Sequence, residues 1–238
     1  MDPIVPAQES DLTSFADSII EKPMVDNADA VARSREKWLS AGTSDSGITA
    51  EDRRNVIDHP HMGGLLDGIF GNSPYLTALI HREADLPVSL LQVPVETLLE
   101  TEMRQLESCW SDPASFRQMA GSLRRIKRRI ALLIAMADTG GVWSVEQVTQ
   151  SLSDFADGAV RSAPRFLLKQ AEAEGHMKLA NADDPAEGSG LFVLAMGKMG
   201  AGELNYSSDI DLIVLFDEQA ALARGLEAPR EFYPRMIR

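Results

Sequence analysis

Residues 191–217 constrain the fold of this 238-residue chain more than any other segment does. Leu191–Met196 is a short, continuously apolar run, which is typical of a buried strand. A glycine-rich turn follows, and Asp209–Phe216 then has a second strand pattern. The segment therefore predicts two strands joined by a turn, with carboxylates at the start of the second strand.

The acidic pair Asp209 and Asp211 is the candidate catalytic and metal-binding feature. Side chains alternate between the faces of a strand, so both carboxylates should project from one side, while Ile210 and Leu212 face the core. Two neighbouring acids repel each other unless a cation offsets their charge. Mg²⁺ prefers carboxylate oxygens together with substrate phosphates, so the pair predicts a Mg²⁺ site, with Mn²⁺ as the alternative ion. A solvated strand edge is the non-functional interpretation.

A candidate phosphate-binding loop lies between the two strands. Glycine allows the backbone to approach a phosphate closely and to adopt φ above zero, while lysine adds positive charge and serine adds hydroxyl donors. The expected nucleotide- or phosphate-binding residues are Gly197, Lys198, Gly200, Gly202, Ser207 and Ser208. A plain tight turn with a surface lysine is the alternative. A phosphate held beside metal ions on the aspartates would suit two-metal phosphoryl or nucleotidyl transfer.

Other glycine motifs fit this loop less well. The spacing Gly197-x-x-Gly200-x-Gly202 differs from the G-x-G-x-x-G fingerprint of dinucleotide-binding folds. A P-loop needs Ser or Thr directly after its lysine to bind Mg²⁺, whereas Met199 stands there in this sequence. The signature set of protein kinases is also missing.

The string GKMGAGELNYSSDIDL at residues 197–212 resembles the glutamine synthetase adenylyltransferase family. More generally, a glycine loop followed by Asp-hydrophobic-Asp resembles the polymerase-β-like nucleotidyltransferase superfamily. Lys198 departs from the Gly or Ser that is general in the superfamily, but lysine is usual there in the adenylyltransferases. Weaker resemblance to the same family extends upstream to Ser73–Leu76, Leu123–Arg129 and Leu152–Ala156.

This resemblance implies both a fold and an activity. The fold would be α-rich α+β, with a helical N-terminal region before a truncated polymerase-β-like nucleotidyltransferase domain. Family members are longer and carry two catalytic halves. The first half uses phosphate to remove AMP from a tyrosine of glutamine synthetase, releasing ADP, and the second half attaches AMP from ATP. This chain resembles the first, deadenylylating half.

The implied partners are glutamine synthetase, the PII signal protein, ADP or ATP, and phosphate, in a pathway that regulates nitrogen assimilation. Two alternatives remain open at this stage. One is a uridylyltransferase-type enzyme of the same superfamily, and the other is a non-catalytic helical interaction fragment.

The superfamily also uses a third carboxylate on a later strand. Asp217 cannot supply it, since it lies about 20 Å from Asp211 by strand rise, and Glu218, Glu227 and Glu231 fall in a predicted loop. We therefore expect the third acid beyond the end of this chain, and we expect the chain alone to be inactive. An incomplete sheet should also expose apolar surface and promote self-association.

Helical periodicity fills the region before the strands. The two clearest apolar stripes are Leu98, Leu99, Met103 and Leu106, and then Leu123, Ile126, Ile130 and Ile134. We expect residues 1–180 to be mainly helical with weak order in 1–70, and residues 190–238 to begin the catalytic domain after a polar linker. The glycines of Gly63–Gly71 should break up their segment, and Pro164 should kink or interrupt a helix.

Charge and composition limit the remaining function classes. The net charge of −13 argues against general nucleic-acid binding and against docking on an anionic membrane. The single Cys109 excludes an internal disulfide, the acidic start lacks a signal-peptide pattern, and the apolar runs are too short to span a bilayer. These features together predict a cytoplasmic protein. The basic cluster in Leu123–Arg129 is interpreted as a solvated helix face, and His59 and His61 as a poor metal site.

Overall fold

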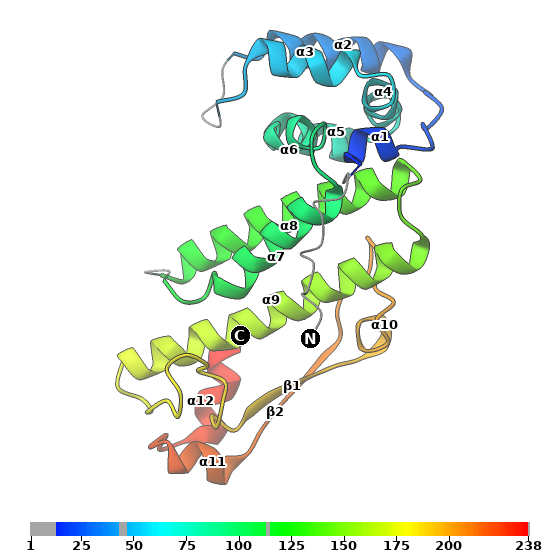
Figure 1. Ribbon diagram of the computed structural model, residues 1–238. Coiled ribbons are helices and arrows are strands. Elements are labelled where there is room, and N and C mark those ends of the chain that lie inside the picture. The colour runs from blue at the N-terminus through cyan, green and yellow to red at the C-terminus, as the bar shows by residue number, and fades with distance from the viewer. Residues whose placement is uncertain (1–12, 43–46, 113–114, 238) are drawn as a thin grey trace, which may run out of the picture. The chain divides into compact units, whose positions relative to one another are not determined.

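The computed structural model describes residues 13–42, 47–112 and 115–237. The acidic start of the chain, Met1–Ser10, lies outside these ranges. The elements are α1 (Phe15–Ser18), α2 (Ala28–Ser40), α3 (Ala50–Asp58), α4 (Met62–Asn72), α5 (Pro74–Arg82), α6 (Asp85–Ser89), α7 (Val95–Ser108), α8 (Phe116–Thr139), α9 (Val145–Ala173), β1 (Leu191–Ala195), α10 (Gly197–Gly200), β2 (Leu212–Phe216), α11 (Glu218–Ala223) and α12 (Pro229–Met236). The described part is thus helix-rich with a small two-stranded sheet, which agrees with an α-rich α+β class (Figure 1).

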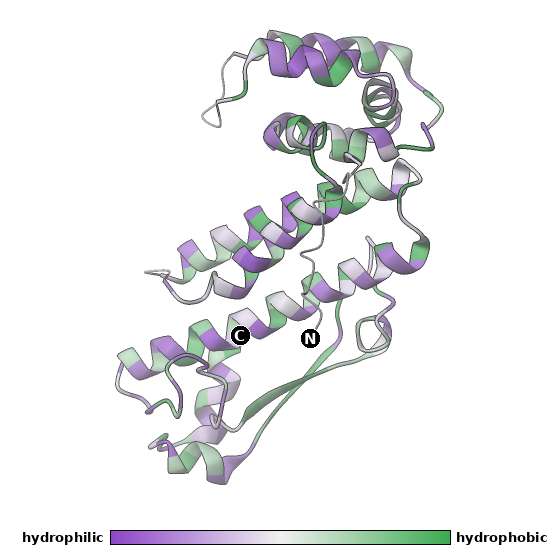
Figure 2. Ribbon diagram, viewed as in Figure 1, coloured by the Kyte–Doolittle hydropathy of each residue, from purple (hydrophilic) through white to green (hydrophobic). Residues whose placement is uncertain are grey.

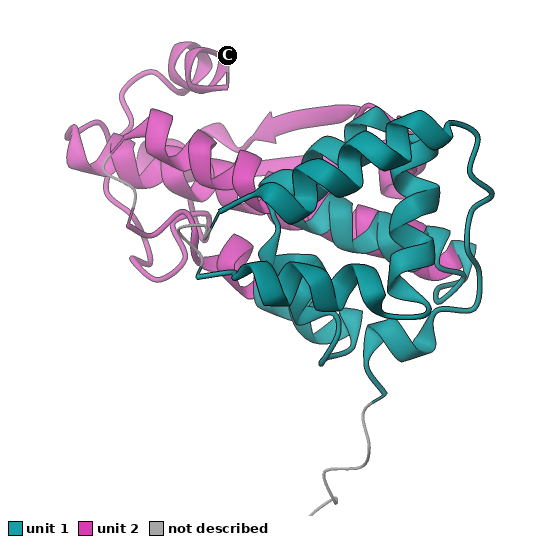
Figure 3. Ribbon diagram, turned by 90° about the horizontal axis from the view of Figure 1, so that it is seen from above, with its two compact units in different colours: residues 1–101, 128–145 teal, residues 102–127, 146–238 magenta. Residues whose placement is uncertain are grey.

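The chain divides into two compact units, shown in different colours in Figure 3. Unit 1 comprises Met1–Thr101 and Arg128–Val145, and unit 2 comprises Glu102–Lys127 and Glu146–Arg238. Helices α7 and α8 contribute residues to both units. The predicted domain division before residue 190 stays a prediction, and the polar segment 181–190 lies within unit 2.

Unit 1 shows regular helices where the sequence suggested only weak order in residues 1–70. Short helices need their first backbone N–H groups satisfied, and side chains supply these bonds at α1, α2 and α3. Thr49 and Asp52 form a reciprocal capping box at the start of α3. The helices then bury large side chains, including Trp38, whose indole N–H donates to the Arg53 carbonyl at 2.9 Å.

The glycines of α4 do not break the helix, contrary to the expectation for Gly63–Gly71. They are required by close packing instead. A Cβ at Gly63 would lie 2.2 Å from the Ile57 carbonyl oxygen, and a Cβ at Gly68 would lie 2.7 Å from Pro23. Because the segment is buried against neighbouring backbone, tertiary contacts outweigh the low helix propensity of glycine.

Helix α8 has the predicted apolar stripe, with Ile126, Ile130 and Ile134 all buried. The basic cluster on this helix has two different environments. Arg124, Arg125 and Lys127 are at least partly exposed, as a solvated face requires.

The last two basic residues of the cluster are instead bound to acids within unit 1. Arg128 contacts Glu83 at 3.1 Å, and Arg129 contacts Glu83 at 3.2 Å and Asp85 at 2.8 Å. The Glu83 side chain is only 8% exposed, so these ion pairs satisfy a buried carboxylate. The prediction of a wholly solvated face is therefore wrong for these two arginines.

Helix α9 runs without interruption through Pro164, so of the two predicted outcomes the interruption is excluded and the kink stays a prediction. Proline removes one backbone hydrogen bond from the helix. The helix nevertheless buries an apolar face on both sides of this position, including Leu152, Ala156, Phe166 and Leu168. That burial holds the helix together where the local bond is lost.

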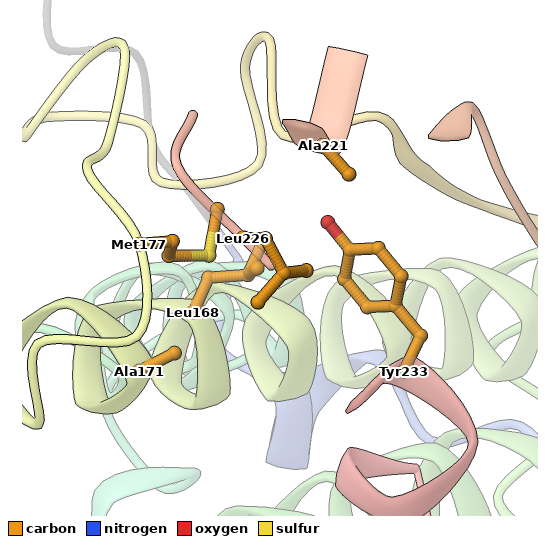
Figure 4. Close-up of a cluster of buried hydrophobic side chains, with 6 residues drawn as sticks. All are labelled: Leu168, Ala171, Met177, Ala221, Leu226 and Tyr233. Carbon is orange, nitrogen blue, oxygen red and sulfur yellow. The ribbon is translucent and has the colours of Figure 1, made fainter. Parts of the chain in front are cut away.

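Unit 2 has a core beside the C-terminal end of α9 (Figure 4). Its buried members are Leu168, Ala171, Met177, Ala221, Leu226 and Tyr233. Leu191 and Phe216, which pair across the ends of β1 and β2, pack against this cluster. The Tyr233 hydroxyl donates to the Ser189 carbonyl at 2.7 Å and fastens α12 to the segment before β1.

The two strands form an antiparallel sheet in which Leu191 pairs with Phe216 and Ala195 pairs with Leu212. The strands are hydrophobic along their length (Figure 2). The continuous apolar run predicted buried strands, but one face of this sheet is exposed. Four paired side chains of one face are exposed: Phe192 at 48%, Leu194 at 46%, Ile213 at 43% and Leu215 at 40%.

Candidate functional site

The acidic pair lies just before β2 rather than within it. The last strand pair is Ala195 with Leu212, and the Met196 N–H still donates to the Asp211 carbonyl at 2.9 Å. Gly197 then turns the chain with a φ of 56°, which ends the ladder. The prediction that Asp209 and Asp211 alternate along a regular strand is therefore wrong.

The neighbouring apolar residues also differ from expectation. Ile210 is 42% exposed and Leu212 is 37% exposed, so neither is buried in the core. Both aspartates are exposed as well, which leaves their carboxylates accessible to solutes.

Gly197 and Asp211 are brought together by this turn. The carboxylate Oδ2 of Asp211 lies 3.6 Å from the place that a Cβ on Gly197 would occupy. Since glycine has no side chain, the carboxylate faces bare backbone at the start of the loop. The structure thus joins one predicted metal ligand to the first predicted phosphate-binding residue.

The other loop glycines have conformational reasons of their own. A Cβ at Gly200 would lie 2.5 Å from the Ala195 carbonyl oxygen, and Gly202 has a φ of 72°. The Lys198 carbonyl accepts from the Glu203 N–H at 2.8 Å, which folds the loop back on itself. The Lys198 side chain is exposed. Tight-turn geometry therefore accounts for the glycines, and their contact with a phosphate stays a prediction.

Ser207 and Ser208 are organised by Asn205, which sequence reasoning did not single out. The Asn205 Oδ1 accepts from the Ser207 N–H at 3.2 Å and from the Ser208 hydroxyl at 2.7 Å. An Asn side chain that accepts a hydrogen bond from the backbone N–H two residues later forms an Asx-turn. Asn205 and Ser207 form such a turn. The serines lie beside the acidic pair in sequence, with the Ser208 hydroxyl already held by Asn205.

Helix α9 contacts the loop through a second residue that sequence reasoning missed. The Leu204 N–H donates to the Ser153 Oγ at 3.1 Å, and the Ser153 hydroxyl donates to the Thr149 carbonyl at 2.8 Å. Ser153 is 4% exposed and Leu204 is 7% exposed. The available signal was a polar residue inside a helix face that otherwise carries Leu152 and Ala156.

Within the described ranges, no three His, Cys, Asp or Glu side chains lie close enough together to hold a metal ion. Asp209 and Asp211 therefore have no third ligand of these types there. Asp217 instead caps α11 by accepting from the N–H groups of Gln219 and Ala220. Glu218 pairs with Arg230 at 2.7 Å. Glu218 therefore lies in α11 and Glu231 in α12, rather than in the predicted loop.

Cavities in unit 2 lie beside α9. The larger one has a volume of about 550 Å³ and the second about 360 Å³; the second is lined by α9, β1 and Met199. None of the predicted site residues lines either cavity. At the larger one, Arg165 bonds Asp184 at 2.9 Å and lowers the pKa of that carboxyl. No helix in the described residues has the length and apolar character needed to cross a bilayer.

Comparison with known proteins identifies the relatives of this chain. A family model described as glutamate-ammonia ligase adenylyltransferase matches residues 64–238. A protein of Rhodopseudomonas palustris strain BisB5, named bifunctional glutamine synthetase adenylyltransferase/adenylyl-removing enzyme, is 44% identical over 185 residues, which cover 77% of this chain and 19% of the relative. A Bradyrhizobium protein of the same name is 40% identical over 227 residues, which cover 93% of this chain and 22% of the relative.

The chain therefore spans about a fifth of the length of these curated relatives. The family model nevertheless covers most of the chain, including the loop and the acidic pair. On this ground the chain belongs to the glutamate-ammonia ligase adenylyltransferase family.

Proposed function

We propose that the protein containing this chain is a nucleotidyltransferase that removes AMP from an adenylylated tyrosine of glutamine synthetase. Phosphate would act as the second substrate and ADP would be released. The observation that carries the proposal is the Asp211 carboxylate against Gly197 in a loop that the family model covers. The names of the relatives, which combine adenylyltransferase and adenylyl-removing activity, support the same proposal.

The reaction exchanges one phosphorus–oxygen bond for another. A phosphate oxygen attacks the AMP phosphorus, the bond from phosphorus to the tyrosine oxygen breaks, and a proton restores the tyrosine hydroxyl. The products are ADP and unmodified tyrosine. Catalysis of this exchange consists mainly of positioning the reactants and stabilising the negative charge that develops.

The loop residues have distinct roles in this proposal. Gly197, Gly200 and Gly202 would let phosphate oxygens approach the backbone, and the exposed Lys198 would add positive charge. Ser207 would donate a hydrogen bond at the same place, and Ser208 would do so once its hydroxyl leaves Asn205.

Asp209 and Asp211 would hold Mg²⁺, or Mn²⁺ in its place, because two exposed carboxylates offer the hard oxygen donors that these ions bind. The ion supplies charge stabilisation to the transferring phosphoryl group when bound. A third carboxylate would come from another part of the protein.

The same proposal assigns the protein a regulatory setting. Removal of AMP would change the activity state of glutamine synthetase, so the enzyme would regulate nitrogen assimilation in the cytoplasm, with the PII signal protein as a partner. The link to glutamine synthetase rests on the names of the relatives, and the other statements rest on the family resemblance.

Phosphorolysis by the full-length protein tests the function. Adenylylated glutamine synthetase, phosphate and Mg²⁺ are supplied, and ADP release is followed for wild type and for Asp209→Asn/Asp211→Asn. We expect a loss of at least about a hundredfold in the double variant, because charge stabilisation is removed. Asp217→Asn is the matched control, since asparagine also caps a helix and the rate should be retained.

Two outcomes would contradict the proposal. Undiminished ADP release by the double variant would remove the aspartates from the reaction. No release by wild type, with adenylylation from ATP intact, would place the chemistry in another part of the protein. Transfer of UMP from UTP to a PII protein would instead favour the uridylyltransferase alternative.

A further inference from the structure

The loop that carries the candidate site is fixed at two places in unit 2. At its base, the Met196 N–H donates to the Asp211 carbonyl at 2.9 Å and closes residues 196–211 into one loop. Near its middle, the Leu204 N–H donates to Ser153 on α9 at 3.1 Å. A loop held only at its base could rotate about that point, so the second contact, together with the buried Met199, restrains the middle of the loop.

Ser153 is suited to this contact by its own bonding. A hydroxyl has one donor and two acceptor positions. Ser153 uses its proton on the Thr149 carbonyl, one helical turn earlier, at 2.8 Å. The proton is therefore directed along the helix, and the oxygen presents a lone pair to the Leu204 N–H.

Water cannot easily replace this bond. Ser153 and Leu204 are only 4% and 7% exposed. A buried N–H that loses its acceptor keeps its full desolvation cost. Most of the surrounding loop residues are exposed, and Met199, at 5% exposed, is the other buried one, so Leu204 is one of two buried points of the loop.

A second residue of the same helix lies near the loop. The Gln150 Oε1 lies 3.6 Å from the place that a Cβ on Gly202 would occupy. Gln150 and Ser153 are three residues apart and so lie on neighbouring positions of one helix face. Gly202, with a φ of 72°, therefore passes close to α9 just before Leu204 reaches it.

We propose that Ser153 is a positioning residue for the nucleotidyl-transfer site. Through the Leu204 N–H it fixes the loop that places Gly197, Lys198 and the acidic pair. This inference rests on the proposed function. Ser153 would act through Leu204 and not by contact with a reacting group.

The experiment compares three serine variants of the full-length protein. Ser153→Ala removes the acceptor. Ser153→Thr keeps a hydroxyl, and threonine in a helix can also donate to the carbonyl one turn earlier. Ser162→Ala is the matched control, because Ser162 is a buried serine of the same helix whose hydroxyl donates to the Leu106 carbonyl at 2.9 Å and not to the loop.

Two readouts are taken from each variant: hydrogen exchange at the Leu204 amide, and the kcat and KM of AMP removal. For Ser153→Ala we expect exchange at Leu204 to rise by about tenfold or more, as loss of a buried bond implies. We expect kcat to fall by about tenfold while KM for adenylylated glutamine synthetase stays within about twofold, because ground-state binding is kept. Ser153→Thr should restore both readouts, and Ser162→Ala should leave both unchanged.

The outcomes separate this inference from the proposed function. An unchanged kcat in Ser153→Ala would overturn the positioning role if Asp209→Asn/Asp211→Asn is inactive in the same assay. An equal fall of kcat in Ser162→Ala would also overturn it, since the effect would then follow general weakening of α9. Retained activity in the aspartate variant would instead reject the proposed function, and the Leu204 exchange rate would still report whether the bond to Ser153 holds the loop.

Discussion

His81 lies among aromatic rings and has a shifted pKa. Its ring stacks on Phe70 with centroids 5.8 Å apart and planes 5° apart, and Trp38 lies 6.2 Å away. The Nε2 atom is buried without a hydrogen-bond partner in the described structure. Burial, with the nearby charges of Lys37 and Arg53, lowers the His81 pKa from 6.5 to about 4.

This lowered pKa predicts a dependence of stability on pH. Between about pH 6.5 and 4 the unfolded chain binds a proton at His81 that the folded chain does not. Stability is therefore fully present above pH 6.5 and falls as the pH drops through this window, by up to about 1.4 kcal/mol per pH unit. Urea unfolding at a series of pH values from about 7 to about 4.5, which spans most of this window, measures the change.

His81→Phe is the control for this prediction. Phenylalanine keeps a flat ring against Phe70 but has no proton to bind. The difference in unfolding free energy between wild type and variant should shift in favour of the variant as the pH falls. A constant difference across the same pH series would contradict the assigned pKa.

At the scale of elements, two helical glycines have opposite environments. At Gly63 in α4 the Ile57 carbonyl oxygen lies 2.2 Å from the place that a Cβ would occupy, whereas Gly121 in α8 has open space there. Gly121→Ala should stabilise the chain by about 0.5–1 kcal/mol through helix propensity. Gly63→Ala should destabilise it by about 1–3 kcal/mol, because backbone must move to admit the methyl group.

Urea unfolding followed by circular dichroism compares these two variants with wild type. The same chemical change is thus tested in a packed and in an open helix. Equal gains in unfolding free energy from both substitutions would show that α4 is not packed against the Ile57 carbonyl.

The same contrast explains which elements the sequence could predict. The stripes of α7 and α8 repeat at helical spacing, so local periodicity was sufficient to predict these helices. Helix α4 was not predicted, because its glycines are explained by contacts with Ile57 and Pro23 that no local pattern contains. The interruption at Pro164 was wrongly allowed for a related reason, since burial on both sides of this residue maintains α9.

The candidate site was predictable in its residue types more than in its geometry. The glycine turn and the acids follow from adjacent residues, but the Asp209–Asp211 segment lies before β2, and Ile210 beside it is exposed. The contact between Ser153 and Leu204 joins residues 51 positions apart. Such a pair depends on tertiary packing, so the local pattern of the sequence cannot reveal it.

At the scale of the whole chain, the exposed face of the small sheet is the feature with the clearest consequence. Phe192 pairs with Leu215 and Leu194 pairs with Ile213, and all four side chains are exposed. They form a contiguous apolar face on a sheet whose described strands have two unpaired edges. Exposed apolar faces and open strand edges favour association with other chains.

We therefore expect the 238-residue chain to self-associate through this face. Sedimentation velocity over a hundredfold range of micromolar concentrations should show a rise in mass, since burying such side chains contributes about 1.5–3 kcal/mol each. Phe192→Lys/Ile213→Lys should weaken the association by at least about tenfold, which corresponds to about 1.4 kcal/mol. Phe116→Lys is the control, because Phe116 is 65% exposed but lies on α8, away from the sheet in sequence. A monomer mass at every concentration would show that the chain does not self-associate. An equal loss of association in the control would show that the sheet face is not the contact surface.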